Sequence, residues 1–184
     1  MRVTISSSSN DAIDVKYKES SIKICSYLAE NEWDLNWGSG SISIMGICYD
    51  VFNKYNRTIY GYTSPKYADD IDNLPNAKHE IYETTFDLKK HIFEDADMLL
   101  MLPGGTGTIS EFFAYLEEIR SNDVNIPLVV YNEDHVFDST IALIDDLISK
   151  NFNRSNIYDY FKIANSFEEF KSIVEEIKNN VLKK

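Results

Sequence analysis

The sequence predicts an α/β fold, a three-layer domain with a mostly parallel sheet of about seven strands. Two observations lead there. Short apolar runs of strand length alternate along the chain with longer segments whose apolar residues recur at helical spacing. Two of these runs, 33–37 and 99–102, are followed directly by glycine-containing turns and then by a helical pattern. At 184 residues the chain has the length of one such domain, predicted to span residues 1–184.

The expected strands and helices follow one another in order. The first strand covers residues 2–6, and the helix after its polar loop begins where Asn10 or Asp11 provides an N-cap. Residues 63–78 are polar and contain two prolines, which favours a loop that acts as a lid. The other expected strands are 33–37, 57–62, 79–83, 99–102, 126–131 and 160–164, and the other expected helices are 41–54, 86–95, 108–120, 141–148 and a last one from about 166.

Composition limits the partners and the compartment. The net charge of −12 argues against a nucleic acid polymer or an anionic membrane surface as a partner. No apolar run approaches the roughly 18 residues of a membrane span, and the start does not have the composition of a signal peptide. Cys25 and Cys48 lie in apolar patterns and suit buried thiols in a reducing cytoplasm. His79, His91 and His135 are too far apart to indicate a metal site.

The segment from Pro103 to Glu111, with the sequence PGGTGTISE, is the strongest candidate site. Gly104, Gly105, Thr106, Gly107 and Thr108 lie between an apolar strand and a helix, where open α/β sheets bind ligands. Glycines allow a ligand to approach the backbone closely, and a helix N-terminus attracts anions. The segment therefore predicts a phosphate-binding site. The carboxylate at the end of the segment lies beside it. The last four residues also match a capping box, the commoner explanation when they are taken alone.

Two other loops are expected at the same sheet edge. Ser7, Ser8 and Ser9 follow the first strand and could donate hydroxyls to a nucleotide, although an ordinary serine turn explains them as well. The loop with Gly38, Ser39 and Gly40 follows the second strand and offers a further backbone cradle. In a parallel sheet all three loops converge at the carboxyl ends of the strands.

The nine residues from Pro103 to Glu111 resemble the PGGxGTxxE signature of the Lonely guy (LOG) family, whose members were once thought to be lysine decarboxylases. The resemblance implies a Rossmann-like homodimer that needs no cofactor. It also implies hydrolysis of a purine or cytokinin-type nucleoside 5′-monophosphate to free base and ribose 5-phosphate. In that activity Glu111 is the catalytic carboxylate. The segment from Gly38 resembles the family's GGGxxGLMG, with Ser39 and Ser43 in place of glycines.

The chain departs from the family pattern before the central motif. Counting back from Pro103 without a gap, Leu88 falls on the functional arginine and Lys89 on the family's lysine. Leucine cannot replace a planar cation, so Lys89 is the candidate for the missing charge, and Lys90, Arg57 and Arg120 stay open. The departure favours an alternative, a non-catalytic module that binds or senses a nucleotide on the same fold.

Overall fold

The computed structural model describes residues 1–94, 96–122 and 124–181. Within these residues seven strands form one sheet in the order β4-β3-β2-β1-β5-β6-β7, and each neighbouring pair is parallel. The predicted α/β class and parallel sheet are therefore confirmed. The strands are β1 (Arg2–Ser6), β2 (Asp34–Trp37), β3 (Ile59–Thr63), β4 (Lys78–Ile81), β5 (Met98–Met101), β6 (Leu128–Tyr131) and β7 (Lys162–Ala164).

Helices make the connections between the strands. In the described part of the chain, no helix has the length and apolarity needed to cross a membrane. The helices are α1 (Val15–Glu30), α2 (Ser43–Lys54), α3 (Thr85–Glu94), α4 (Thr106–Asn122), α5 (Asp138–Ser149) and α6 (Phe167–Val181), with the 3-10 helices η1 (Pro65–Asn73) and η2 (Ser155–Tyr160).

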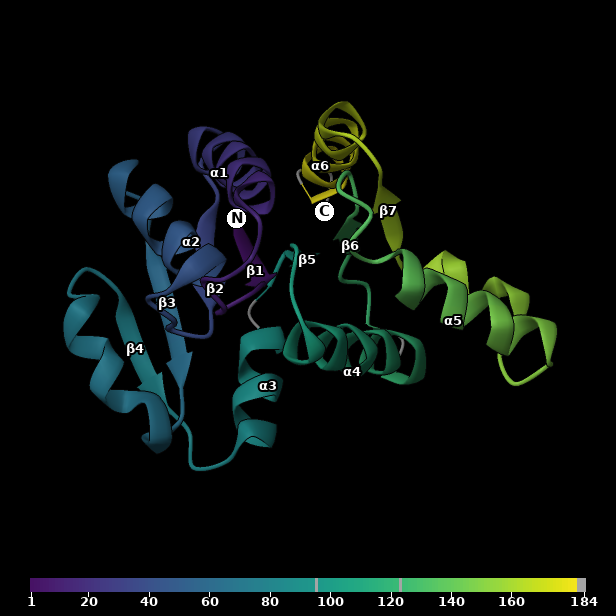
Figure 1. The fold of residues 1–184 in the computed structure, drawn as a ribbon, viewed down its shortest axis with the longest axis horizontal. Coiled ribbons are helices and arrows are strands. Elements are labelled where there is room, and N and C mark those ends of the chain that lie inside the picture. The colour runs from purple at the N-terminus through teal and green to yellow at the C-terminus, as the bar shows by residue number, and fades with distance from the viewer. Residues whose placement is uncertain (95, 123, 182–184) are drawn as a thin grey trace.

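The sheet is the middle of three layers. Helices α1, α2 and α6 cover one face, and α3, α4 and α5 lie on the other (Figure 1). Successive side chains of a strand point to opposite faces, so one strand supplies both cores. In β5, Leu100 packs into the α1/α2/α6 core, whereas Leu99 and Met101 pack into the α3/α4/α5 core.

Strand β1 is apolar on one face and polar on the other. In β1, Val3 and Ile5 belong to the α1/α2/α6 core, so Thr4 and Ser6 point toward α3 and α4. The Thr4 hydroxyl accordingly donates to the carbonyl of Ile92 in α3, over 2.7 Å. Both polar side chains are buried. The α3 side of β1 is therefore a buried polar surface that ends at the carboxyl edge of the sheet.

The start of α1 differs from the prediction. Asp14 is the N-cap, and its carboxylate accepts from the Lys16 amide at 3.0 Å. The expected cap at Asn10 or Asp11 is wrong. The Asn10 side chain instead closes a local turn by accepting from the Ala12 amide at 3.0 Å. The loop after β1 is consequently longer than the sequence pattern indicated.

The region expected to be a loop between β3 and β4 is mostly helical. Residues Pro65–Asn73 form η1, so the expectation of an irregular segment over 63–78 is wrong. Leu74 follows η1 and is buried in the α1/α2/α6 core. The ring of His79 in β4 lies 3.1 Å from the Leu74 carbonyl through Nε2. Both contacts fix the end of η1 to the sheet.

Cys25 and Cys48 are buried and free, as the sequence indicated. They face each other where α1 packs against α2, with 3.7 Å between the two Sγ atoms. The contact with Cys48 and burial raise the pKa of the Cys25 thiol well above its usual value. Both side chains therefore act as small apolar groups in this core.

Candidate functional site

The sheet changes its winding direction between β1 and β5, which are neighbours in space but not in sequence. At such a switch point the two connections diverge and leave a crevice at the carboxyl ends of the strands. Ser6 pairs with Met101 at this edge. Beyond it, the Ser8 amide donates to the Pro103 carbonyl at 3.0 Å, and the Ser8 carbonyl accepts from the Met45 amide at 3.2 Å. Backbone hydrogen bonds thus join the loop after β1 to the loop after β5 and to the start of α2.

Helix α4 begins earlier than predicted, at Thr106. The Gly105 carbonyl already accepts the helical hydrogen bond from the Ile109 amide, at 3.0 Å. The expected helix start at Thr108 and its capping box with Glu111 are wrong, because Thr108 is inside the first turn. The first-turn amides of a helix carry a partial positive charge and have no partner within the helix. In α4 these amides belong to the glycine-rich segment itself.

The three glycines of this segment have different surroundings. None has a positive φ, so the turn itself does not require them. A Cβ on Gly104 would lie 2.0 Å from Oγ1 and 2.6 Å from Cβ of Thr108, so that glycine is needed for packing. A Cβ on Gly105 or Gly107 would meet no protein atom within 4 Å. The backbone at these two positions is open to a ligand, as a phosphate-binding site requires.

Glu111 lies one turn into α4, half-buried beside this opening. Burial raises the pKa of its carboxyl above the usual value, whereas the nearby Ser6 hydroxyl and the positive charge of Lys89 lower it. Burial is the largest of these influences. A carboxylate with a raised pKa accepts a proton more readily, which suits a general base.

Lys89 approaches the site from α3. Its Nζ donates to the hydroxyl of Ser110 at 2.9 Å, and its charge acts on Glu111, the next residue of α4. Leu88, in contrast, packs against the α3/α4/α5 core. Leu88, at the family's arginine position, thus points into the core, and the next residue, Lys89, places a positive charge near Glu111.

The other cations that the sequence left open have carboxylate partners. Arg57 binds the Asp34 carboxylate at 3.0 Å, at the amino ends of β2 and β3. Arg120 binds Glu117 at 2.7 Å on the outer surface of α4. Lys90 lies 3.8 Å from a carboxylate on the same exposed face of α3.

The loop of Gly38, Ser39 and Gly40 packs against His79 of β4 and Met45 of α2. The Ser39 hydroxyl lies 3.1 Å from Nδ1 of His79, and its side chain therefore points toward β4. A Cβ would lie 3.0 Å from Met45 at Gly38 and 2.8 Å from Met45 at Gly40. The Met45 side chain thus packs against the α-carbons of both glycines, which are themselves partly exposed.

The serines after β1 have separate surroundings. The Ser8 hydroxyl accepts from the Asn10 amide at 3.1 Å and so stabilises the turn. The Ser7 hydroxyl oxygen is buried and has no hydrogen-bond partner among the described residues. Of these two serines, Ser7 is the one whose hydroxyl has no partner among the described residues.

Two residues next to Glu111 were not predicted from the sequence. Ser6 ends β1, and Tyr115 follows Glu111 by one helical turn. Both hydroxyls are buried, and neither makes a hydrogen bond of normal geometry within the described part of the chain. Ser6 influences the pKa of both Glu111 and Tyr115, which places it beside both side chains. The available signals were a polar residue at the end of an apolar strand and the i, i+4 spacing of the two α4 residues.

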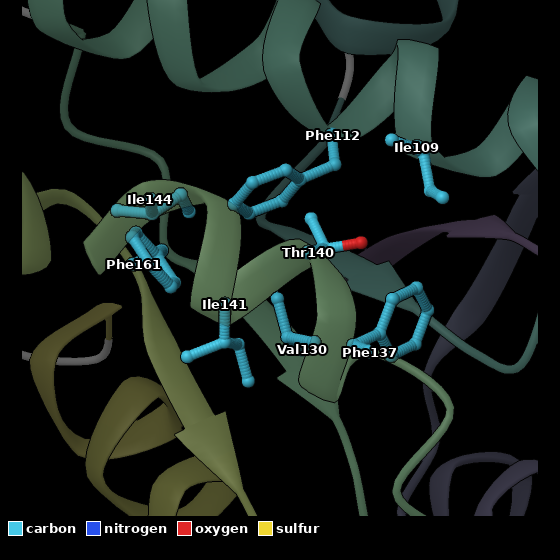
Figure 2. Close-up of a pocket in the computed structure, with 8 residues that line it drawn as sticks. All are labelled: Ile109, Phe112, Val130, Phe137, Thr140, Ile141, Ile144 and Phe161. Carbon is cyan, nitrogen blue, oxygen red and sulfur yellow. The ribbon is translucent and has the colours of Figure 1, made fainter. Parts of the chain in front are cut away.

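Two cavities lie on the α5 side of α4. One is an apolar cavity of about 10 Å³, far too small for a nucleotide (Figure 2). It is lined by Ile109, Phe112, Val130, Phe137, Thr140, Ile141, Ile144 and Phe161. The other, of about 550 Å³, is a groove between α4, α5 and η2, lined in part by Phe113, Leu116 and Phe152. Neither is lined by Glu111. Within the described ranges, no three His, Cys, Asp or Glu side chains are grouped to hold a metal ion.

Comparison with known sequences identifies relatives along most of the chain. The family described as "Possible lysine decarboxylase" matches residues 45–174. The cytokinin riboside 5′-monophosphate phosphoribohydrolase LOG2 of Arabidopsis thaliana is 24% identical over 179 residues, which cover 95% of this chain and 83% of that protein. A probable enzyme of the same name, LOG4 of rice (Oryza sativa subsp. japonica), is 23% identical over 81% of this chain and 65% of that protein.

Comparison with solved structures supports the fold. The molybdenum cofactor carrier protein of Chlamydomonas reinhardtii superposes with a TM-score of 0.66 at 12% identity, over 97% of this chain and 98% of that one. The molybdenum cofactor binding protein of Rippkaea orientalis gives a TM-score of 0.66 at 16% identity, over 96% of each chain. At these identities the likeness concerns the fold alone.

Proposed function

Because the chain belongs to the family described as "Possible lysine decarboxylase", which includes the LOG phosphoribohydrolases, we propose that it is a nucleoside 5′-monophosphate phosphoribohydrolase. It would cleave the N-glycosidic bond of a purine or cytokinin-type nucleotide. One observation carries the proposal most strongly. The carboxylate of Glu111, whose pKa is raised, lies near the positive charge of Lys89 and near the open glycine backbone of α4, at the switch point of the sheet.

The open segment suits the 5′-phosphate. The amides at Gly105, Thr106, Gly107 and Thr108 would bind its oxygens, and the helix dipole would favour its negative charge. The protein has a net charge of −12, so binding of the anion depends on this local arrangement. Ser7 and the backbone after β1 lie along the same edge and would contact the ribose.

Glu111 would carry out the acid–base chemistry. Its negative charge stabilises the oxocarbenium-like ribose, and its carboxylate takes a proton from the attacking water. The water oxygen bonds to C1′ as the bond from C1′ to the base nitrogen breaks. The departing base keeps the electron pair and takes up a proton from solvent, and Glu111 afterwards releases its proton to solvent. Lys89 would donate a hydrogen bond to the departing base, in place of the family's arginine.

Decarboxylation, which the family description also mentions, fits the residues less well. That chemistry needs pyridoxal phosphate on a lysine whose pKa is lowered, for example by desolvation. None of the described lysines is fully buried, and Lys89 donates to Ser110. We therefore propose an enzyme without a cofactor. We also propose a cytoplasmic homodimer whose contact includes the groove between α4 and α5, where Phe152 is 77% exposed.

The test is incubation with AMP and a panel of other nucleoside monophosphates, followed by chromatography of the released base. The variant Glu111→Gln keeps the side-chain shape and loses the base, so release should stop. The matched control is Glu117→Gln, an exposed carboxylate on the same helix, which should release base at the normal rate.

The same experiment decides the alternative of a non-catalytic nucleotide-binding module, which the apolar Leu88 favours. If AMP raises the melting temperature but no monophosphate in the panel loses its base, the chain binds nucleotides without cleaving them. Loss of release in both Glu111→Gln and Glu117→Gln would point to general damage to α4.

A further inference from the structure

Two buried hydroxyls near Glu111 need an explanation. Ser6 is 3% exposed and Tyr115 is 1% exposed, and neither hydroxyl makes a hydrogen bond of normal geometry to a described residue. The Ser6 hydroxyl nevertheless lies close enough to the Glu111 carboxylate and to the Tyr115 hydroxyl to lower the pKa of both groups. Leaving a buried hydroxyl unpaired costs free energy, and such groups in a folded protein call for a role. Both lie where the polar face of β1 meets α4.

The fold holds both hydroxyls in place. Ser6 is fixed by its pairing with Met101 at the end of the ladder between β1 and β5. The Tyr115 ring stacks on Phe93 of α3, with 5.6 Å between ring centroids and 29° between planes. Tyr115 is four residues after Glu111, so the two side chains leave the same face of α4.

The groups that face Glu111 come from three elements. Ser6 comes from β1, Lys89 from α3, and Tyr115 from α4 itself. Lys89 is the charged group among them, and it also binds Ser110. The two hydroxyls are neutral and can each donate or accept a hydrogen bond.

We propose that Ser6 and Tyr115 are positioning residues that hold the attacking water against the Glu111 carboxylate. This inference rests on the proposed hydrolysis. A water bound there would have three polar partners, within the two to four that ordered buried waters make. The two hydroxyls would direct a lone pair of this water toward C1′. The Glu111 carboxylate would take a proton from the water as the bond between the water oxygen and C1′ forms. Neither hydroxyl changes its own protonation state.

The experiment compares Tyr115→Phe and Ser6→Ala with the unaltered protein, using the nucleotide that is cleaved best. Tyr115→Phe keeps the ring and its packing, so the protein should melt no lower than normal. We expect kcat to fall about 10- to 100-fold while KM stays within about twofold, because water alignment affects the chemical step. The matched control is Tyr158→Phe, which removes a hydroxyl that donates to Asp145 of α5.

The pH profile separates positioning from a merely structural role. The Ser6 hydroxyl lowers the pKa of Glu111, so in Ser6→Ala the acid limb of kcat should move to higher pH. The acid limb of Tyr158→Phe should not move. The inference is overturned if Tyr115→Phe and Ser6→Ala both have the same kcat and the same pH profile as Tyr158→Phe. The proposed hydrolase activity would stand in that case. If the unaltered protein releases no base, the proposed function fails and the inference falls with it.

Discussion

Replacing Gly107 by alanine should make the protein more stable and less able to bind its ligand. The new methyl group would meet no protein atom within 4 Å, and the φ of Gly107 is not positive, so the backbone accepts alanine without strain. Alanine in a helix is favoured over glycine by about 0.5–1 kcal/mol. For a chain of this length that corresponds to a rise in Tm of about 1–4 °C.

The same methyl group would occupy the space assigned to the phosphate. We expect the affinity for AMP to fall by at least about tenfold, or about 1.4 kcal/mol, and base release to fall with it. Differential scanning calorimetry gives the stability change, and titration calorimetry gives the affinity. Ser172→Ala, on the exposed face of α6, is the control that adds helix propensity far from the site.

Gly104→Ala should behave in the opposite way. Its Cβ would lie 2.0 Å from the Thr108 hydroxyl oxygen, and overpacking of this kind costs about 1–3 kcal/mol, so Tm should fall by about 2–12 °C. If Gly107→Ala binds AMP as tightly as the unaltered protein does, no phosphate lies at the start of α4, and the site proposed there is refuted. A lower Tm for Gly107→Ala would show that its surroundings are not open.

Three further predictions follow from the same contacts. Lys89→Met should lower base release about 10- to 100-fold, whereas Lys90→Met on the exposed side of α3 should change it less than about twofold; equal effects would contradict a specific role for Lys89. Glu111→Gln should raise Tm at pH 7, because burial raises the pKa of Glu111 and the folded state therefore loses stability as the pH rises from the usual glutamate pKa through the raised one. The gain in Tm should shrink in melts at lower pH, where Glu111 is protonated. A gain that stays the same at lower pH would show that burial of the charge is not its cause. Gly46→Ala should lower the free energy of unfolding by about 1–3 kcal/mol in urea titrations, because its Cβ would lie 2.4 Å from the Ser41 carbonyl oxygen; an unchanged midpoint would contradict this close approach.

The sheet and the main candidate segment could be predicted because their signals are local. The apolar run 99–102 and the break at Pro103 depend on neighbouring residues, and the parallel order follows from alternating strands and helices. The approach of the loop after β1 to the loop after β5 also follows from topology, and the structure joins them through Ser8 and Pro103.

Other features depend on long-range contacts and could not be predicted. The first hydrogen bond of α4 goes to Gly105, although Thr108 offers the better cap by composition. Ser39 and Ser43 both have positive φ, at 54° and 59°, where the family pattern has glycine. Both serines thus adopt a backbone conformation that favours glycine. Nothing near Tyr115 in the sequence indicates a buried hydroxyl, because Ser6 reaches it across more than 100 residues.

The contact between Cys25 and Cys48 offers a direct measure of how often the α1/α2/α6 core opens. Alkylating reagents react with the thiolate, and both thiols are buried, with the pKa of Cys25 raised. Labelling therefore requires that α1 separate from α2, and its rate reports the population of opened molecules. A nucleotide that binds only the folded state should slow labelling in proportion to its occupancy. Ligands of this protein can thus be ranked by thiol protection, without any assay of base release.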